Sequence, residues 1–125
     1  MTPLTTRATA QRFDIDGYEV HPVAAPSRGS SELAVWSIRA TPGAASVTHQ
    51  HDREVVFVVS TGRMVAVIGD ERFEAGPGDA FIVPPKTDFT LSNASADDPA
   101  SLTVATTVGM HAFVDGEAFP PPWTL

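Results

Sequence analysis

The spacing of proline and glycine limits the folds open to this chain more than any other feature. Eleven prolines and nine glycines interrupt its 125 residues, and most segments between them are too short for a stable helix. These segments are rich in β-branched and aromatic residues, which favour strands. The pattern therefore predicts an all-β protein whose strands are joined by turns.

Turn residues separate the expected strands from one another. Gly62 and the pair Gly69-Asp70 each close one strand and start the next, and Asp16-Gly17 is typical of a tight hairpin turn. Short strands with such turns indicate a β-sandwich or barrel. The expected strands cover residues 12–15, 18–23, 33–40, 45–51, 54–60, 63–68, 72–74, 80–83, 88–92 and 101–108.

The length and composition fit one globular domain. A chain of this size corresponds to a single domain of about 100–150 residues, and 42% hydrophobic with 18% charged residues is an ordinary globular mixture. We expect one domain over residues 1–125. It comprises an N-terminal hairpin at 12–23, a barrel at about 33–108, and a proline-rich tail at 112–125 that Trp123 anchors across the surface.

The charge balance and the absence of cysteine exclude several classes of function. Eight Lys and Arg stand against fifteen Asp and Glu, a formal net charge of −7. Such a chain lacks the basic surface that holds nucleic acid or anionic lipid. Without cysteine there is no disulfide or thiolate chemistry. Because no signal peptide or membrane-spanning run is evident, we expect a cytoplasmic protein with a small-molecule partner.

Two histidines, His49 and His51, stand two residues apart in an expected strand. Alternate side chains of a strand point to the same face, so both imidazoles would lie side by side. Two neutral imidazoles can chelate a divalent metal such as Zn, Fe, Mn, Ni or Cu. Spacing alone is weak evidence, because most such pairs are solvated or hydrogen-bonded.

Two glycine-framed motifs surround this pair. They read Gly43-AASVT-His49-Gln50-His51-DREVVFVVST-Gly62 and Gly78-DAFIV-Pro84-Pro85-Lys86-TD-Phe89-TLS-Asn93. They resemble the motifs G-x5-H-x-H-x3,4-E-x6-G and G-x5-P-x-G-x2-H-x3-N of the cupin superfamily. The resemblance covers about residues 33–108 and implies a small single-domain cupin, a jelly-roll β-barrel with a metal or ligand site inside it.

The sequence departs from the metal-ligand positions that the resemblance implies. Val55 stands at the glutamate position, Phe89 at the third histidine position and Lys86 at the turn glycine. Only His49 and His51 are kept. Metal sites usually have at least three protein ligands, so two imidazoles alone would bind weakly.

Glu54 is the residue best placed to complete a metal site with the two histidines. It precedes the expected strand and would point inward only if a bulge shifted the register. Otherwise it is a solvated carboxylate paired with Arg53 or Arg63. Asp52 is more typical of a turn. His111 and His21 could reach the barrel, but an ordinary surface or hydrogen-bonded position fits each of them better.

Side chains in phase with the histidines should line the barrel. Trp36 or Ile38 could add to this lining, which is apolar and partly aromatic. Such a pocket suits a hydrophobic or aromatic molecule better than a sugar or a phosphate, although small barrels also fill their interiors with side chains. The residues expected to line the pocket are Val55, Phe57, Val59, Met64, Ala66, Phe89 and Leu91.

Three functions remain open. The first, which the resemblance to cupins implies, is a metal-dependent oxygenase, isomerase or cyclase acting on a hydrophobic or aromatic substrate, polyketide-like compounds included. The second is a metal-free isomerase or cyclase in which His49 or His51 is a general acid or base. The third is a non-catalytic ligand-binding module. We expect no organic cofactor, and the resemblance implies a homodimer formed through exposed edge strands.

Overall fold

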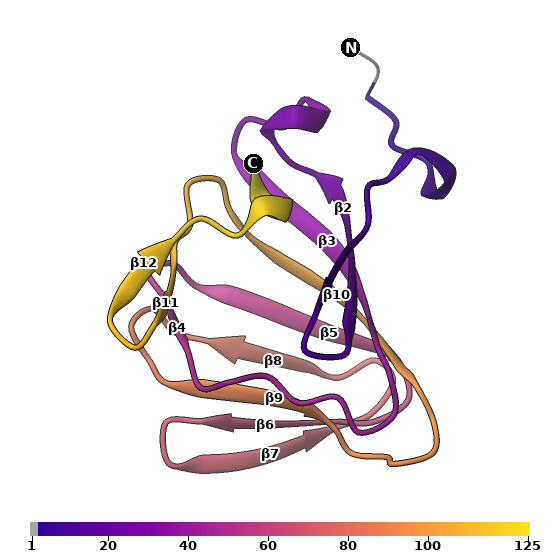
Figure 1. The fold of residues 1–125 in the computed structure, drawn as a ribbon, viewed down its shortest axis with the longest axis vertical. Helices are drawn as coiled ribbons and strands as arrows, with labels where there is room; N and C mark the ends of the chain where they lie inside the picture. The colour runs from indigo at the N-terminus through magenta and orange to yellow at the C-terminus, as the bar shows by residue number, and fades with distance from the viewer. Residues whose placement is uncertain (1–2) are drawn as a thin grey trace.

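The computed structural model describes residues 3–125, which form an all-β structure with three short 3₁₀ turns (Figure 1). None of the described helical turns is long or apolar enough to span a membrane. The turns are η1 (Arg7–Thr9), η2 (Pro26–Arg28) and η3 (Pro122–Thr124). The strands are β1 (Phe13–Ile15), β2 (Tyr18–Ala24), β3 (Leu33–Ala40), β4 (Gln50–His51), β5 (Val55–Thr61), β6 (Met64–Ile68), β7 (Glu71–Ala75), β8 (Ala80–Val83), β9 (Phe89–Asn93), β10 (Ala100–Thr107), β11 (Ala112–Val114) and β12 (Glu117–Phe119).

Three antiparallel sheets enclose the core. The largest has the strand order β1-β2-β3-β10-β5-β8, and the two smaller sheets have the orders β7-β6-β9 and β12-β11-β4. Strand β3 alternates exposed and buried positions, as expected of a sheet with one face on the core. Buried residues of β5, such as Val55, and of β6, such as Met64, belong to one hydrophobic cluster. The large sheet and the β7-β6-β9 sheet therefore cover the same core from two sides.

The Asp16-Gly17 turn forms as the sequence predicts. Both residues have positive φ angles, 52° and 85°, which is the conformation of a type I′ hairpin turn between β1 and β2. The hydroxyl of Thr41 donates a hydrogen bond of 2.8 Å to the carbonyl oxygen of Gly17. A Cβ atom at Gly17 would lie 2.9 Å from Cβ of Ala44. The close approach of this turn to the start of the histidine-bearing segment therefore needs glycine.

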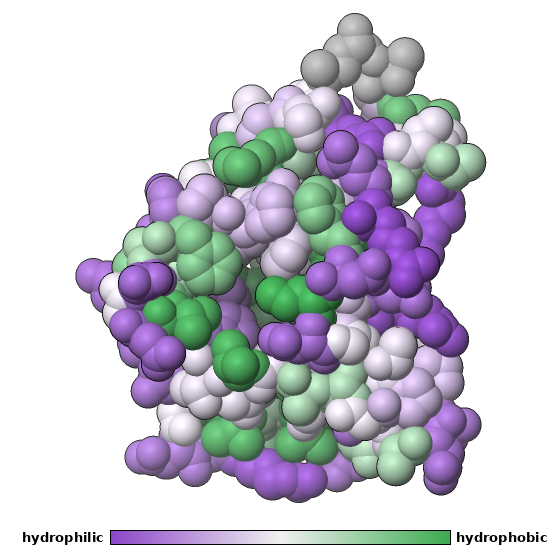
Figure 2. Space-filling model, viewed as in Figure 1, coloured by the Kyte–Doolittle hydropathy of each residue, from purple (hydrophilic) through white to green (hydrophobic). Residues whose placement is uncertain are grey.

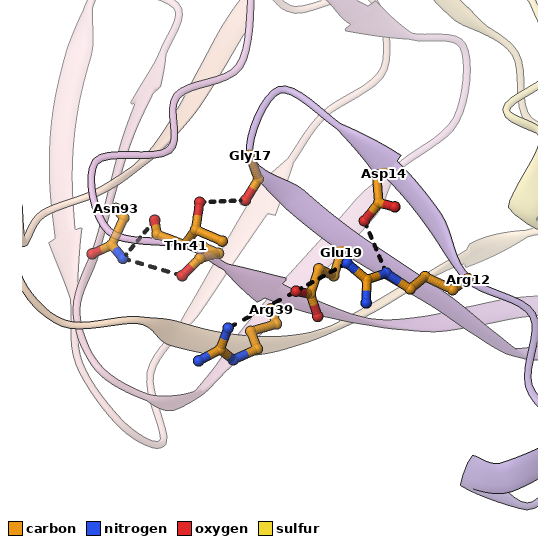
Figure 3. A network of polar contacts seen from close by, with 8 residues as sticks. Arg12, Asp14, Gly17, Glu19, Arg39, Thr41 and Asn93 are labelled. Atoms are coloured by element: carbon orange, nitrogen blue, oxygen red, sulfur yellow. Dashed lines mark hydrogen bonds and ion pairs between the residues drawn. The ribbon is translucent and has the colours of Figure 1, made fainter.

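The asparagine of the second motif, Asn93, joins the end of β3 to the loop between β9 and β10, and Figure 3 shows its contacts with the β3 end. Its buried side-chain amide donates to the carbonyl oxygens of Ala40, Thr41 and Asp98 at 3.3, 3.2 and 2.8 Å. Its Oδ1 accepts from the backbone N–H of Ser95. Because each partner is a backbone group at the end of β3 or in the loop between β9 and β10, Asn93 stabilises the fold and takes no part in the cavity that the histidines line.

The expected strand at 45–51 is wrong over most of its length. Only Gln50 and His51 form β4, while Ala45 and His49 make isolated bridges to β9. The hydroxyl of Ser46 accepts the hydrogen bond from the N–H of Leu91, so a side chain replaces one backbone acceptor of the ladder. The other expected strands are confirmed to within one or two residues at each end.

The C-terminal tail contains a hairpin that the sequence analysis did not predict. Strands β11 and β12 pair across a turn at Asp115 and Gly116, both with positive φ. Strand β11 also pairs with β4, placing Ala112 opposite His51. Beyond the hairpin, the ring of Trp123 contacts that of Trp36, with centroids 6.3 Å apart. Trp123 therefore contacts β3 at the end of the tail, and the tail also forms strands.

Gly62, the last glycine of the first motif, provides a test of this packing. Its φ is 77°, and an added Cβ would lie 2.8 Å from both Cα of Ala100 and the carbonyl oxygen of Pro99. Gly62→Ala is expected to lower the free energy of unfolding by about 3 kcal/mol, through backbone strain and this clash together. The measurement is chemical denaturation. Gly69→Ala is the matched control, because Gly69 also has a positive φ but no atom within 4 Å of the added Cβ, and its cost should be only about 1 kcal/mol.

Candidate small-molecule site

One cavity opens between the β1–β2 hairpin and the β11–β12 hairpin and encloses about 120 Å³. Figure 2 shows a hollow on this face, edged largely by apolar side chains. The floor comes from β3, β5 and β9, and the two histidines lie on its wall. The lining residues are Ile15, Asp16, Tyr18, Val20, Trp36, Ile38, Val47, His49, His51, Phe57, Phe89, Leu91, Ala112, Val114, Phe119, Pro121 and Trp123.

The ring of His49 has a defined tautomer. Its Nδ1 lies 2.8 Å from the carbonyl oxygen of Val47, and because a carbonyl can only accept, Nδ1 carries the proton. In the neutral ring, Nε2 then keeps its lone pair. Burial lowers the pKa of His49 below its usual value of 6.5, and the hydrogen bond to Val47 partly opposes that effect. At neutral pH His49 is therefore a neutral imidazole with a free basic nitrogen.

His51 is more deeply buried, with 5% of its surface exposed. It lies in β4 opposite Ala112 of β11, so the C-terminal hairpin covers it. Nδ1 of His51 is buried and has no hydrogen-bond partner among the described residues. Burial, reinforced by the neighbouring His49, lowers the pKa of His51 to about 3. His51 is thus a neutral ring that resists protonation.

Phe89 packs against both histidines. Its backbone pairs with His49 in an antiparallel bridge, with hydrogen bonds of 3.0 and 3.1 Å, which sets the two side chains on the same face. The ring centroid of Phe89 lies 4.2 Å from that of His49 and 5.1 Å from that of His51. The His49 and His51 centroids are 5.1 Å apart. An aromatic ring without a donor atom therefore completes this cluster of three rings.

The structure does not bring Glu54 to the histidines. Its side chain is exposed, and its carbonyl oxygen accepts a hydrogen bond of 2.7 Å from the hydroxyl of Thr106. The next residue, Val55, begins β5 in an unbroken register with β8 and is fully buried. Because no bulge shifts this register, Glu54 does not share the inward face of Val55. The expectation that Glu54 supplies a third metal ligand is corrected accordingly.

The other ligand candidates are engaged elsewhere. His111 is exposed, and its Nδ1 lies 3.5 Å from a carboxylate oxygen of Asp52. Asp52 also accepts the backbone N–H of His111, as a turn residue would. Nδ1 of His21 donates to the carbonyl oxygen of Gln11, and His21 does not line the cavity. Over residues 3–125 no group of three or more potential metal ligands is formed.

These residues do not fit the metal centre that the family motifs imply. Among residues 3–125, the two imidazoles are the only nitrogen ligands on the cavity wall, the lining carboxylate of Asp16 does not group with them, and a phenyl ring occupies the place of a third. Zinc and the redox metals are normally held by three or more protein ligands. The donor set is therefore too small for a tightly bound ion.

The expected pocket lining divides into two groups. Phe57, Phe89 and Leu91 line the cavity, as do both alternatives from β3, Trp36 and Ile38. The remaining expected residues are buried but fill the core away from the cavity, as inward side chains of small barrels commonly do. They are Val55, Val59, Met64 and Ala66.

Sequence reasoning missed the walls supplied by the two ends of the chain. Tyr18 and Val20 of β2 face the cavity from one side, and Val114, Phe119 and Trp123 face it from the other. The signal for the second wall was the dipeptide Asp-Gly at 115–116 between two short alternating segments. The three prolines at 120–122 led to the prediction of a tail over residues 112–125, so the hairpin before them was not predicted.

Comparisons with known proteins agree with this architecture. Residues 36–106 match the family model described as "Cupin domain", and no curated protein matches the sequence. An RmlC-like cupin from Shewanella frigidimarina has a TM-score of 0.73 and 19% identity, over 86% of this chain and 91% of that chain. The polyketide cyclase RemF from Streptomyces resistomycificus has a TM-score of 0.76 and 16% identity, over 96% and 83%.

A third similar structure is a sugar phosphate isomerase from Silicibacter pomeroyi, with a TM-score of 0.68 and 24% identity over 82% of this chain and 68% of that chain. At these identities the likeness concerns the fold alone. The structural neighbours carry different activities, so the choice among functions depends on the cavity of this chain.

Proposed function

Because the chain belongs to the cupin domain family, we propose that it is a small-molecule enzyme that acts on a hydrophobic or aromatic substrate at His49 and His51. The reaction is an isomerisation or cyclisation that starts with removal of a proton next to a carbonyl group. The observation that carries this proposal is a pair of neutral imidazoles on the wall of an otherwise largely apolar cavity.

The two histidines suit different tasks. The free Nε2 of His49 can take a proton from carbon, giving an imidazolium and an enolate, and later return that proton to another atom. His51 is too weak a base for this step, because its pKa is about 3. As a neutral ring it retains one N–H group, which can donate a hydrogen bond to the developing enolate oxygen.

The aromatic walls favour a planar, apolar substrate. Trp36, Phe57 and Phe89 line the cavity, and aromatic rings stack well on other aromatic rings. A sugar or a phosphate would find few hydrogen-bond partners there. The metal-dependent oxygenase, isomerase or cyclase considered from the sequence has less support, because the residues present supply too few ligands. The homodimer, the single domain over 1–125 and the cytoplasmic location remain predictions.

The test uses hydrogen–deuterium exchange at the benzylic α-carbon (C1) of 2-tetralone, a bicyclic ketone with one fused benzene ring, followed by NMR in D₂O. The wild-type protein is expected to accelerate exchange, and His49→Gln to reduce the rate at least about tenfold by removing the base. The rate should fall as the pH is lowered through the depressed pKa of His49, below 6.5, since only the neutral ring accepts a proton. Binding of 2-naphthol, measured by fluorescence, should differ little between His49→Gln and the wild type.

The control variant is His21→Gln, which removes a buried histidine that does not line the cavity. Its exchange rate should equal that of the wild type. If His49→Gln exchanges 2-tetralone as fast as the wild type while both bind 2-naphthol, the site is a non-catalytic binding module. If dialysis against a chelator abolishes exchange and zinc restores it, the metal-dependent function replaces our proposal.

A further inference from the structure

The rim of the cavity carries one charged side chain, Asp16. It stands in the turn between β1 and β2, next to Ile15, and it is the only acidic or basic residue other than the histidines among the described residues that line the cavity. No Lys or Arg of residues 3–125 lines the cavity. The turn is fixed, because the carbonyl oxygen of Gly17 accepts hydrogen bonds from both the N–H and the hydroxyl of Thr41.

The carboxylate of Asp16 has no ion pair or hydrogen bond within residues 3–125, unlike its neighbour on the same hairpin. Figure 3 shows Arg12 bound to Asp14 and Glu19, with N–O distances of 3.0 and 3.2 Å. The guanidinium group of Arg12 is thus already shared by two carboxylates. The carboxylate of Asp16 at the mouth of the cavity is therefore available to a ligand.

The charge of Asp16 reaches into the cavity. Burial is the main influence on the pKa of His49, which it lowers, and the negative charge of Asp16 acts against it. Burial also raises the pKa of Tyr18, and the charge of Asp16 adds to that increase. Both rings lie on the cavity wall, so a ligand in the cavity would experience the same negative field.

The remaining walls complement a cation. Tyr18, Trp36, Phe119 and Trp123 present aromatic rings to the same space, and the faces of such rings attract ammonium groups. An anionic ligand would meet the opposite conditions. It would find no cationic side chain in the cavity, one carboxylate at its rim, and a chain whose net charge is −7.

We propose that the cavity takes aromatic amines, with the ammonium group held by Asp16 at the rim and the aromatic body lying inward against the histidines. This inference rests on the proposed function only in that the ligand occupies the same cavity. It narrows the substrate class, because carboxylates and phosphates are excluded by charge. Asp16 is then a specificity-determining residue that the sequence presents merely as half of a hairpin turn.

Three ligands with one naphthalene body and different charges provide the test: 2-naphthylmethylamine, 2-naphthalenemethanol and 2-naphthoate. Their dissociation constants are measured by calorimetry at neutral pH and low salt. We expect the amine to bind about three to ten times more tightly than the alcohol, and the carboxylate most weakly. Without a counter-charge the order of amine and alcohol would reverse, because an ammonium group loses more hydration on entering an apolar cavity.

Asp16→Asn is the decisive variant, because asparagine also adopts the left-handed conformation of the turn. It should abolish the preference for the amine, so that the alcohol binds at least as tightly as the amine, and leave the alcohol's affinity unchanged. Asp70→Asn is the control. It changes the net charge equally at the turn before β7, and Asp70 does not line the cavity, so the preference should persist.

Two results would overturn the inference. One is a wild-type protein that binds 2-naphthoate as tightly as 2-naphthylmethylamine, and the other is an amine preference that survives Asp16→Asn in a variant of normal thermal stability. Either result leaves the His49-dependent exchange of 2-tetralone intact. Conversely, loss of that exchange with the amine preference retained would contradict the proposed function and support the binding specificity.

Discussion

Lowering the pH from 6.5 to 4.5 is expected to reduce the free energy of unfolding by about 2 kcal/mol through His51 alone. In the folded protein the pKa of His51 is about 3, and in the unfolded chain it returns to 6.5. Between these values the unfolded state binds one more proton than the folded state. Stability is therefore complete above pH 6.5 and falls by about 1.4 kcal/mol for each unit below it.

The pH range ends at 4.5 so that the titration of Glu74 does not contribute to the measured slope. Glu74 has a lowered pKa because Arg63 donates a hydrogen bond to it, so the stability that it contributes is lost only as the pH falls below its usual value of 4.5. His49 acts in the same direction as His51, since burial lowers its pKa too. Chemical denaturation at several pH values between 4.5 and 6.5 measures the slope directly.

His51→Leu should remove most of this slope, because leucine fills much of the same buried space and cannot be protonated. The Nδ1 atom has no partner in the described structure, so no hydrogen bond is lost with it. Val59→Ala is the control: it lowers stability by creating a cavity in the core and contains no titratable group. We expect the Val59→Ala slope to equal that of the wild type and the His51→Leu slope to be much shallower, with only the contribution of His49 remaining. Equal slopes in all three proteins would contradict the buried neutral imidazole.

The fold follows from local sequence signals to an unusual extent. Turns at Asp16-Gly17 and Gly62 need backbone conformations that few other residues adopt, so the positions of these turns can be predicted from the sequence. The same kind of reasoning gave a wrong result for residues 45–51. Their apolar and β-branched side chains suit a strand, but only Gln50 and His51 form one. Pairing there is interrupted by the hydroxyl of Ser46, and a local pattern contains no information about which partner a backbone group will find.

The candidate site was only half predictable. Strand alternation placed His49 and His51 together, and the register of β9 set Phe89 beside them. The opposite walls depend on long-range packing of the chain ends, such as Trp123 on Trp36. Alternation also does not distinguish a side chain that faces a cavity from one that fills the core. Val59 and Leu91 are both buried, yet only Leu91 lines the cavity.

Phe89→His is expected to turn the pair of histidines into a metal site. Phe89 is bridged to His49, and its ring already contacts both imidazoles, so a histidine in the same place adds a third nitrogen ligand. Both existing rings have lowered pKa values and need not lose a proton to bind a metal. We expect the affinity for Zn²⁺ to rise at least about 100-fold, since even outer partners of a metal ligand contribute about 10- to 100-fold.

Competition with a fluorescent chelator measures this affinity, and the visible spectrum of Co²⁺ reports the ligand geometry. Without metal the variant should be about 2–4 kcal/mol less stable, because Phe89 is 2% exposed in the core. Zinc should then raise its melting temperature while leaving that of the wild type unchanged. Phe57→His is the control. Phe57 also lines the cavity, but within the described residues its ring contacts Phe89 and neither histidine, so the new imidazole should not complete the site. If the wild type binds zinc as tightly as Phe89→His, a third ligand is already present and our account of the donor set is wrong.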